Sequence, residues 1–436
     1  MEQIQTHWLR GFIWLSILAV LILMCSYWAN DYSVSLSPGM VSQIMYNWEK
    51  NIPFLPWTII PYWSLYGLCV VSLFLPMTMY AHRQHALRLI SAAPIALICF
   101  YFYPTANSAT LPLTHGLNIW QALYDRLMLF DKPVGQSPAL HIILLVIVWR
   151  AYITQFGEIG RIFLNIGCFI IGLCALTTYQ HHIIDTTAGF LIGVIICYVF
   201  PLSKQHRFQW QYPANIRLAS RYLLPGMFLL TTAFFVNYWA ALFILWVSLS
   251  TILVGLAYMG LGPIIFQKHR YGKFSYSARI IHAPYRFASR LVRKYFFESA
   301  PAPQRITDQL YLGAFGMHNH IDCNAVFDLC SEYEREGVYK KKYVSYPLID
   351  QTVPTLDQLH VGAMKLDKLV KEHETVFVHC ALGMSRSASL AIAWLLFSRQ
   401  VKNMEDVNTF LKNNNIQSNL SDTHMQLLYS YSQQFV

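Results

Sequence analysis

Apolar residues form long uninterrupted runs along the first part of the chain, between Phe12 and Phe266. An α-helix rises about 1.5 Å per residue, so roughly 20 apolar residues cross the hydrocarbon of a bilayer. One buried helical core would not need so many separate runs. We therefore expect a multi-pass α-helical membrane domain of about eight spans. The expected spans are Phe12–Tyr27, Ile59–Tyr80, Leu89–Tyr103, Ala139–Ile153, Ile162–Tyr179, Ile183–Phe200, Leu223–Tyr238 and Ala241–Phe266.

The pattern changes after Ala300, where apolar and polar residues mix as they do in soluble domains. From Gln304 to Val436, short β-like runs alternate with helical patterns, which predicts an α/β layer fold. The composition agrees with two unlike parts, because only 12% of all residues are charged, against about a quarter in typical soluble domains. We expect a membrane domain at 1–266, a connector at 267–303 and an α/β domain at 304–436.

The basic residues indicate how the chain is oriented. The net charge is +10, and the cations cluster beside the apolar runs, which favours membrane topology and lipid contacts over nucleic acid. If the N-terminus is cytoplasmic, sixteen basic residues lie on the cytoplasmic side. Only three, Lys50, Arg126 and Lys132, lie opposite. The positive-inside rule then predicts that both termini are cytoplasmic. The cysteines show no metal-binding spacing, so we expect no metal and no cofactor.

The connector predicts an amphipathic helix that Pro284 can open at its first turn. Such a helix suits an anionic membrane surface. The alternative is a linker helix packed on the following domain. The basic residues of one face are Arg286, Arg290, Arg293 and Lys294, and the apolar residues opposite are Phe287, Leu291, Val292, Tyr295 and Phe296.

The segment from His379 to Ser387 carries the clearest chemistry. A predicted strand at Thr375–Val378 leads into a tight loop, and a helix follows from about Ser387. Cys380 and Arg386 enclose five residues, so the turn directs successive backbone N–H groups inward at a helix N-terminus. Such an oxyanion nest, together with the guanidinium, favours negative charge on the cysteine sulfur and binds phosphate.

This string, His-Cys-x-x-Gly-x-x-Arg-Ser, resembles the cysteine-dependent phosphatases, in particular the dual-specificity branch. Asp308–Gly313 and Val326–Leu329 are similar to the first strands of that domain. The resemblance implies that Cys380 attacks phosphorus, that Ser387 assists its departure and that His379 tunes the loop. The implied phosphate-binding residues are Ala381, Leu382, Gly383, Met384, Ser385 and Arg386.

A general acid must protonate the leaving oxygen. Asp350 precedes the nucleophile by thirty residues, where the family places its acid, and Asp357 is the runner-up. The loop lacks lysine, so a polyanionic inositide is not favoured as substrate. A phosphoprotein or a lipid head-group phosphate both remain open.

Polar residues also interrupt the membrane half between 137 and 189, where ionisable groups are expensive. His181 and Asp185 are four residues apart, which predicts a shared helix face. Pro-x-x-His at His141 and His-x-x-x-Asp at His181 resemble the type 2 phosphatidic acid phosphatase superfamily, including its head-group transferases. By that resemblance His181 is a nucleophile, Asp185 its orienter and His141 an acid, with His182 competing.

The family's Lys-x6-Arg-Pro motif is absent, and Arg126 and Lys132 are the local cations. Fusions of both domains occur in bacterial inner-membrane proteins, which the whole chain resembles. The leading hypothesis is therefore a bacterial inner-membrane phosphatase with membrane lipids as partners, a phosphorylated protein or lipid as substrate, and a second lipid phosphate site. The rivals are a head-group transferase with a regulatory C-terminal domain and a non-catalytic phosphate sensor.

Overall fold

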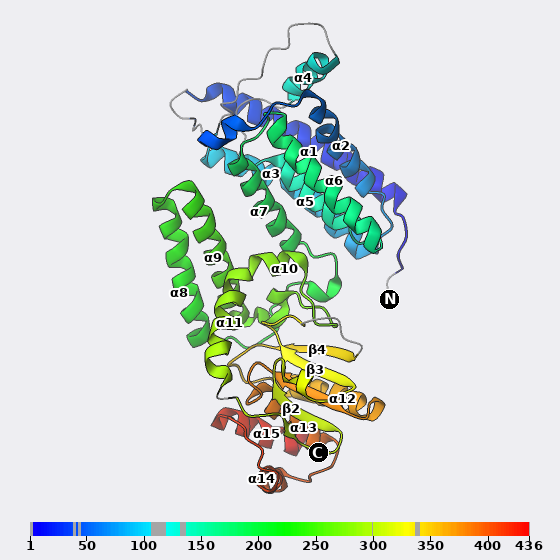
Figure 1. Ribbon diagram of the computed structural model, residues 1–436, viewed down its shortest axis with the longest axis vertical. Helices are drawn as coiled ribbons and strands as arrows, with labels where there is room; N and C mark the ends of the chain where they lie inside the picture. The colour runs from blue at the N-terminus through cyan, green and yellow to red at the C-terminus, as the bar shows by residue number, and fades with distance from the viewer. Residues whose placement is uncertain are drawn as a thin grey trace. The chain divides into compact units, whose positions relative to one another are not determined.

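The computed structural model describes residues 3–37, 41, 45–105, 119–130, 137–298, 300–335 and 341–435. They form two compact units, 1–207 and 208–436, which we describe separately. The first is helical. The second contains an apolar helical hairpin, a connector and a mixed sheet with its helices (Figure 1).

The first unit packs around one short helix. Its helices are α1 (Trp8–Ser35), α2 (Ile59–Ser72), α3 (Met79–Phe102), α4 (Ile119–Phe130), α5 (Leu140–Tyr152), α6 (Glu158–Thr177) and α7 (Ile183–Val199), with 3-10 turns η2 (Asn47–Asn51), η3 (Pro56–Thr58) and η4 (Lys204–His206). Helix α5 contacts α2, α3, α6 and α7, and most of its residues are buried. Its all-round apolar composition therefore reflects burial among helices.

Five helices in the described part of the chain are long and apolar enough to cross a membrane. They are Trp8–Ser35, Met79–Phe102, Glu158–Thr177, Ile216–Phe235 and Tyr238–Phe266, while Leu140–Tyr152 and Ile183–Val199 are apolar but shorter. Each expected span overlaps a helix, and the number of eight spans stays a prediction.

The expected boundary between the second and third spans was wrong. The span expected at Ile59–Tyr80 is helical only to Ser72, and α3 then starts at Met79 rather than Leu89. Thr78 caps this helix by accepting a hydrogen bond from the Ala81 N–H. The polar first half of α3 stays helical because its side chains find carbonyl partners: Arg88, for example, donates to the Phe200 and Cys197 carbonyls at 2.7 and 3.0 Å.

The second unit begins with the hairpin of α8 (Ile216–Thr232) and α9 (Tyr238–Leu256), which run side by side (Figure 1). Asn215 and Asn237 cap these two helices with their side-chain oxygens. Helix α8 starts at Ile216, seven residues before the expected Leu223, because the Asn215 cap can open it earlier. The short turns η5 (Ala233–Phe235), η6 (Ala257–Leu261) and η7 (Gly262–Phe266) complete the hairpin.

The connector contains α10 (Tyr276–Ile281) and α11 (Ala283–Phe297), which confirms the helix expected from Pro284. We expected the basic face of this helix to suit an anionic membrane surface, and this expectation was wrong for two of its residues. Arg286 is buried, 3.5 Å from Glu334, and Arg293 lies over the rings of Phe315 and Tyr333. Burial of these rings and of a carboxylate makes the following domain the better partner for both cations. The expected apolar residues are exposed on α11: Phe287, Leu291, Val292, Tyr295 and Phe296.

The sheet has the order β1-β2-β5-β3-β4, with β1 antiparallel to β2 and the other strands parallel. The strands are β1 (Gln304–Arg305), β2 (Leu310–Ala314), β3 (Ala325–Cys330), β4 (Lys342–Leu348) and β5 (Val376–Cys380). The helices are α12 (Leu356–Glu372), α13 (Arg386–Phe397), α14 (Met404–Asn413) and α15 (Asp422–Phe435), and η8 (Met317–His320) is a 3-10 turn. This arrangement confirms the expected α/β fold, and β5 lies between two parallel neighbours.

Candidate active site

The site lies where the central strand β5 ends and α13 begins. Cys380 is the last residue of β5 and Arg386 the first of α13, so residues 381–385 form the turn at the helix N-terminus. Gly383 has a φ of 78°, and a Cβ there would lie 2.6 Å from the Gly313 carbonyl carbon. Glycine is therefore required for the loop to close against β2. The loop therefore lies between a strand and a helix, as the sequence predicts.

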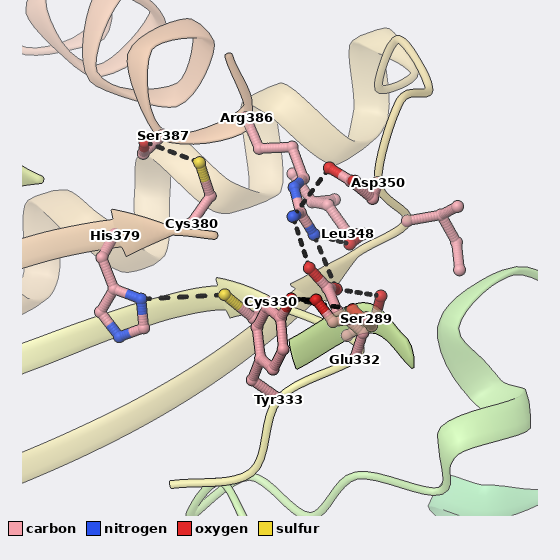
Figure 2. Close-up of polar contacts among 12 residues, drawn as sticks. Ser289, Cys330, Glu332, Tyr333, Leu348, Asp350, His379, Cys380, Arg386 and Ser387 are labelled. Carbon is pink, nitrogen blue, oxygen red and sulfur yellow. Dashed lines mark hydrogen bonds and ion pairs between the residues drawn. The ribbon is translucent and has the colours of Figure 1, made fainter. Parts of the chain in front are cut away.

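Ser387 lies beside Cys380. Its hydroxyl donates to the Cys380 sulfur at 3.2 Å, and both side chains are buried (Figure 2). The opposite side of the loop is held by α15, where Ser385 and His424 are in hydrogen-bond contact at 3.3 Å. The Asn419 N–H also donates to the Met384 carbonyl at 2.9 Å. The loop is thus held on both sides.

Arg386 is fixed by an acidic residue that the sequence did not reveal. Its two terminal nitrogens donate to the Glu332 carboxylate at 2.7 and 3.0 Å, and both side chains are almost fully buried (Figure 2). Burial would raise the pKa of Glu332, but Arg386 outweighs it and holds that pKa below its ordinary value. The pair is thus ionised, and its fork geometry sets the plane of the guanidinium. Glu332 follows β3 in a polar stretch with no recognisable motif.

Asp350 also contacts the guanidinium. Its carboxylate lies 2.9 Å from Arg386 Nη2, and its side chain is 43% exposed (Figure 2). Partial burial and the neighbouring Glu332 carboxylate raise the pKa of Asp350, against the opposing effect of Arg386. A raised pKa suits a carboxyl group that must hold a proton to give away. The runner-up Asp357 lies in the first turn of α12, where a carboxylate stabilises the helix dipole.

His379 lies behind the loop, fully buried. Its Nδ1 is 3.8 Å from Asp328 and 3.9 Å from the Cys330 sulfur. Burial lowers the pKa of His379 to about 4, so its imidazole is neutral at pH 7. Asp328, Cys330 and His379 lie close enough to suggest a metal site. However, the ammonium of Lys268 lies 2.5 Å from Asp328 and already supplies a positive charge there.

The membrane-half residues lie in the first unit, and one expectation about them was wrong. Helix α7 starts at Ile183 with His182 as its N-cap, so His181 precedes the helix and shares no helix face with Asp185. The Asp185 carboxylate instead accepts the backbone N–H of His182 at 2.9 Å. Capping the helix is more favourable for the Asp185 carboxylate than orienting His181, because it satisfies a backbone N–H that would otherwise be unpaired in apolar surroundings.

His141 and Asp185 come from neighbouring helices. The Ala139 N–H donates to the Asp185 carbonyl at 3.0 Å, and the ring of His141 stacks on Tyr62 at 3.7 Å. The sequence missed Glu49, a buried carboxylate 2.8 Å from Nδ1 of His182. No motif links Glu49 to His182, which is 133 residues away.

Of the two local cations, Lys132 lies outside the described residues. Arg126 lies on α4 and is exposed. The structure therefore brings together Glu49, His182 and Asp185, with the start of α5 beside Asp185.

Comparison with known proteins agrees with this geometry. The model of the dual specificity phosphatase catalytic domain matches residues 310–434. Phosphatidylglycerophosphatase and protein-tyrosine phosphatase 1 of Homo sapiens is 30% identical over 94 residues, which cover 21% of this chain and 45% of that protein. The Mus musculus protein of the same name is 29% identical over 92 residues, covering 21% of this chain and 46% of the other. The chain thus spans about half the length of the curated relatives it matches.

Solved structures are also similar to this part of the chain. Tk-PTP in its active form is 20% identical, with a TM-score of 0.28 over 31% of this chain and 98% of that one. PTPMT1 in complex with PI(5)P is 20% identical, with a TM-score of 0.26 over 31% and 97%. The C-terminal part of the chain is a dual-specificity phosphatase domain. This domain places the protein among the phosphatases.

If Asp350 is the general acid, its replacement changes the pH profile. The acid must be protonated, so kcat of the full-length protein falls as pH rises through the raised pKa of Asp350. Asp350→Asn lowers kcat by about a hundredfold or more and removes this alkaline limb. Steady-state rates with phenyl phosphate across pH 5–9 measure both effects. Asp357→Asn is the matched control, and loss of the limb in that variant instead would reverse the assignment.

Proposed function

We propose that this chain is a membrane-bound phosphatase that hydrolyses phosphate monoesters through a phosphocysteine. The observation that carries this proposal is the placement of Cys380 at the N-terminus of α13, with Ser387 3.2 Å from its sulfur. Arg386 lies in the first turn of the same helix with its guanidinium plane fixed by Glu332. Together these groups supply a nucleophile, an anion nest and a phosphate-orienting cation.

The reaction proceeds in two steps, formation of the phosphocysteine and its hydrolysis. The Cys380 thiolate attacks phosphorus and forms the S–P bond, while the P–O bond to the leaving group breaks. Asp350 gives its proton to that leaving oxygen. A water molecule then attacks the phosphocysteine, and its proton passes to the Asp350 carboxylate. The S–P bond breaks, inorganic phosphate leaves, and the Ser387 hydroxyl stabilises the departing thiolate through its hydrogen bond.

The substrate we favour is a phosphate monoester on a lipid head group. The phosphatase domain belongs to the same compact unit as the apolar hairpin α8–α9, so its site is tied to helices suited to a bilayer. The exposed apolar face of α11, including Phe287 and Leu291, would rest on the same surface. The curated relatives carry both a lipid phosphatase and a protein-tyrosine phosphatase activity in their names, so a phosphoprotein is the alternative substrate.

Replacing the nucleophile tests the proposed chemistry. Cys380→Ser in the full-length protein lowers hydrolysis of an aryl phosphate and of a lipid phosphate in mixed micelles by roughly a thousandfold or more, because covalent catalysis is lost. Phosphate release is the measurement, and Cys323→Ser, at a buried cysteine in the loop before β3, is the control. Faster turnover of a phosphotyrosyl peptide than of any lipid would favour the protein substrate. Binding of these phosphate esters by the wild-type protein without release of inorganic phosphate would favour a phosphate sensor.

We further propose a bacterial inner-membrane location with both termini in the cytoplasm. This rests on the distribution of basic residues, and a reactive thiolate also needs a reducing compartment. Fusions of alkaline phosphatase and of a fluorescent protein after Glu49, Gln84, Gln121 and Phe208 are expected to report outside, inside, outside and inside. A periplasmic report from a C-terminal fusion would contradict the orientation.

A second activity in the membrane half is supported by its buried acid–histidine cluster. We propose a histidine-dependent lipid phosphate site with His181 as nucleophile and His141 as acid. The Glu49–His182 contact and the Asp185 cap hold the backbone that carries His181, directly before α7. Burying a carboxylate beside an imidazole near a membrane surface costs free energy, and this cost favours a functional role for the cluster.

This second site predicts activity that survives loss of the first. In the Cys380→Ser background, the full-length protein in micelles releases phosphate from a lipid phosphate, and His181→Gln reduces the rate by about a thousandfold. Glu49→Gln reduces it by roughly tenfold, since the pair positions the backbone rather than reacting. Transfer of labelled phosphate or head group to an alcohol would favour a transferase. Silence with every lipid phosphate would show that the membrane half has no such activity.

A further inference from the structure

The loop that carries the general acid is held by the apolar hairpin as well as by the phosphatase sheet. The Tyr258 hydroxyl donates to the backbone carbonyl of Asp350 at 3.2 Å. Tyr258 lies in the π-helical turn η6 at the end of α9, almost a hundred residues before the acid.

The position of Tyr258 is itself fixed. The Asn215 N–H donates to the Tyr258 carbonyl at 2.8 Å, and the ring stacks on Tyr222 of α8 at 5.4 Å. The Tyr212 N–H donates to the Gly260 carbonyl, and Gly260 has a φ of 128°, which ends the regular helix. The hydroxyl is therefore presented by a tied turn and not by a free helix end.

The acid loop needs outside support. Gln351, directly after Asp350, has a φ of 57°, a left-handed conformation that is strained for a residue with a side chain. The loop borders a small cavity of about 40 Å³, which Tyr212, Tyr258 and Gly262 line from the hairpin side. Ile349 and Pro354 line it from the loop side. The Asp350 carbonyl is thus tied to the hairpin beside this cavity, not to a strand of the sheet.

The Asp350 side chain must also move during catalysis. Nη1 of Arg386 donates to Glu332 and to the Leu348 carbonyl at 3.0 and 2.9 Å. Nη2 contacts Glu332 and Asp350 at 2.7 and 2.9 Å, so Asp350 occupies a donor that a bidentate phosphate needs. When phosphate takes that donor, the carboxyl group turns toward the leaving oxygen. A fixed backbone limits this motion to the side chain.

Resting on the proposed function, we propose that Tyr258 is a positioning residue for the general acid, so that the apolar hairpin is part of the catalytic apparatus. Its hydroxyl holds the Asp350 main chain while the carboxyl group exchanges Arg386 for the leaving oxygen. Proton donation, and not attack by Cys380, then depends on the hairpin.

The leaving group separates these two steps. In the full-length protein, Tyr258→Phe keeps the ring and removes the hydroxyl. For an alkyl phosphate, whose leaving oxygen must be protonated, kcat/KM falls roughly five- to tenfold, about the effect of one hydrogen bond. For dinitrophenyl phosphate, whose leaving group departs without a proton, kcat/KM, which reports only the steps up to the phosphocysteine, stays within about twofold. Tyr429→Phe on α15, which is exposed, is the matched control and is expected to change neither rate.

A double-mutant cycle completes the test. In the Asp350→Asn background, Tyr258→Phe is expected to add no further loss with the alkyl phosphate, because the positioned proton is already absent. Equal losses with both substrates, or a full additional loss in the Asp350→Asn background, would overturn the role of Tyr258. Loss of Cys380 dependence in the parent protein would instead overturn the proposed function, so the two failures are distinguishable.

Discussion

The buried ion pair between Arg386 and Glu332 is the interaction on which the phosphatase site depends. Taking both charges out of water costs several kcal/mol each, and only close, fork-shaped geometry repays that cost. The two bonds of 2.7 and 3.0 Å supply this geometry. They fix the guanidinium at the first residue of α13, beside the turn that follows Cys380. The remaining terminal N–H groups can then meet only Leu348 and Asp350, which ties Asp350 to the same cation.

A second set of buried charges joins the connector to the sheet. Lys268 follows the hairpin and donates to Asp328 and to the Cys330 carbonyl at 2.5 and 2.6 Å. Burial would raise the pKa of Asp328, but the Lys268 ammonium outweighs it and lowers that pKa. This ionised carboxylate lies 3.8 Å from Nδ1 of His379, the residue before Cys380. The connector thus contributes charge to the interior of the phosphatase domain, and removing it would leave Asp328 without its cation.

Helix α11 uses its two faces differently from what its sequence pattern indicates. Arg286 and Arg293 contact Glu334, Phe315 and Tyr333 of the phosphatase domain, and Ser289 bonds to the Tyr333 hydroxyl at 2.8 Å. Phe287, Leu291, Val292 and Tyr295 are exposed instead. An exposed apolar face on a helix that follows an apolar hairpin suits a bilayer surface. The cationic side of this helix contacts the phosphatase domain, and its apolar side is exposed.

The sequence by itself determined the local features of this protein. Apolar runs indicated the helices, and the Cys380–Arg386 spacing with Gly383 indicated the phosphate loop, because these features depend on neighbours in the chain. The sequence-based predictions that failed had one physical cause. Contacts between distant segments have no sequence period, so Glu332, Lys268 and Tyr258 carried no signal. The helix-face argument for His181 failed because capping by Asp185 moved the helix start to Ile183. The tertiary structure alone decided which charges pair, since burial makes an unpaired charge too costly and leaves few arrangements.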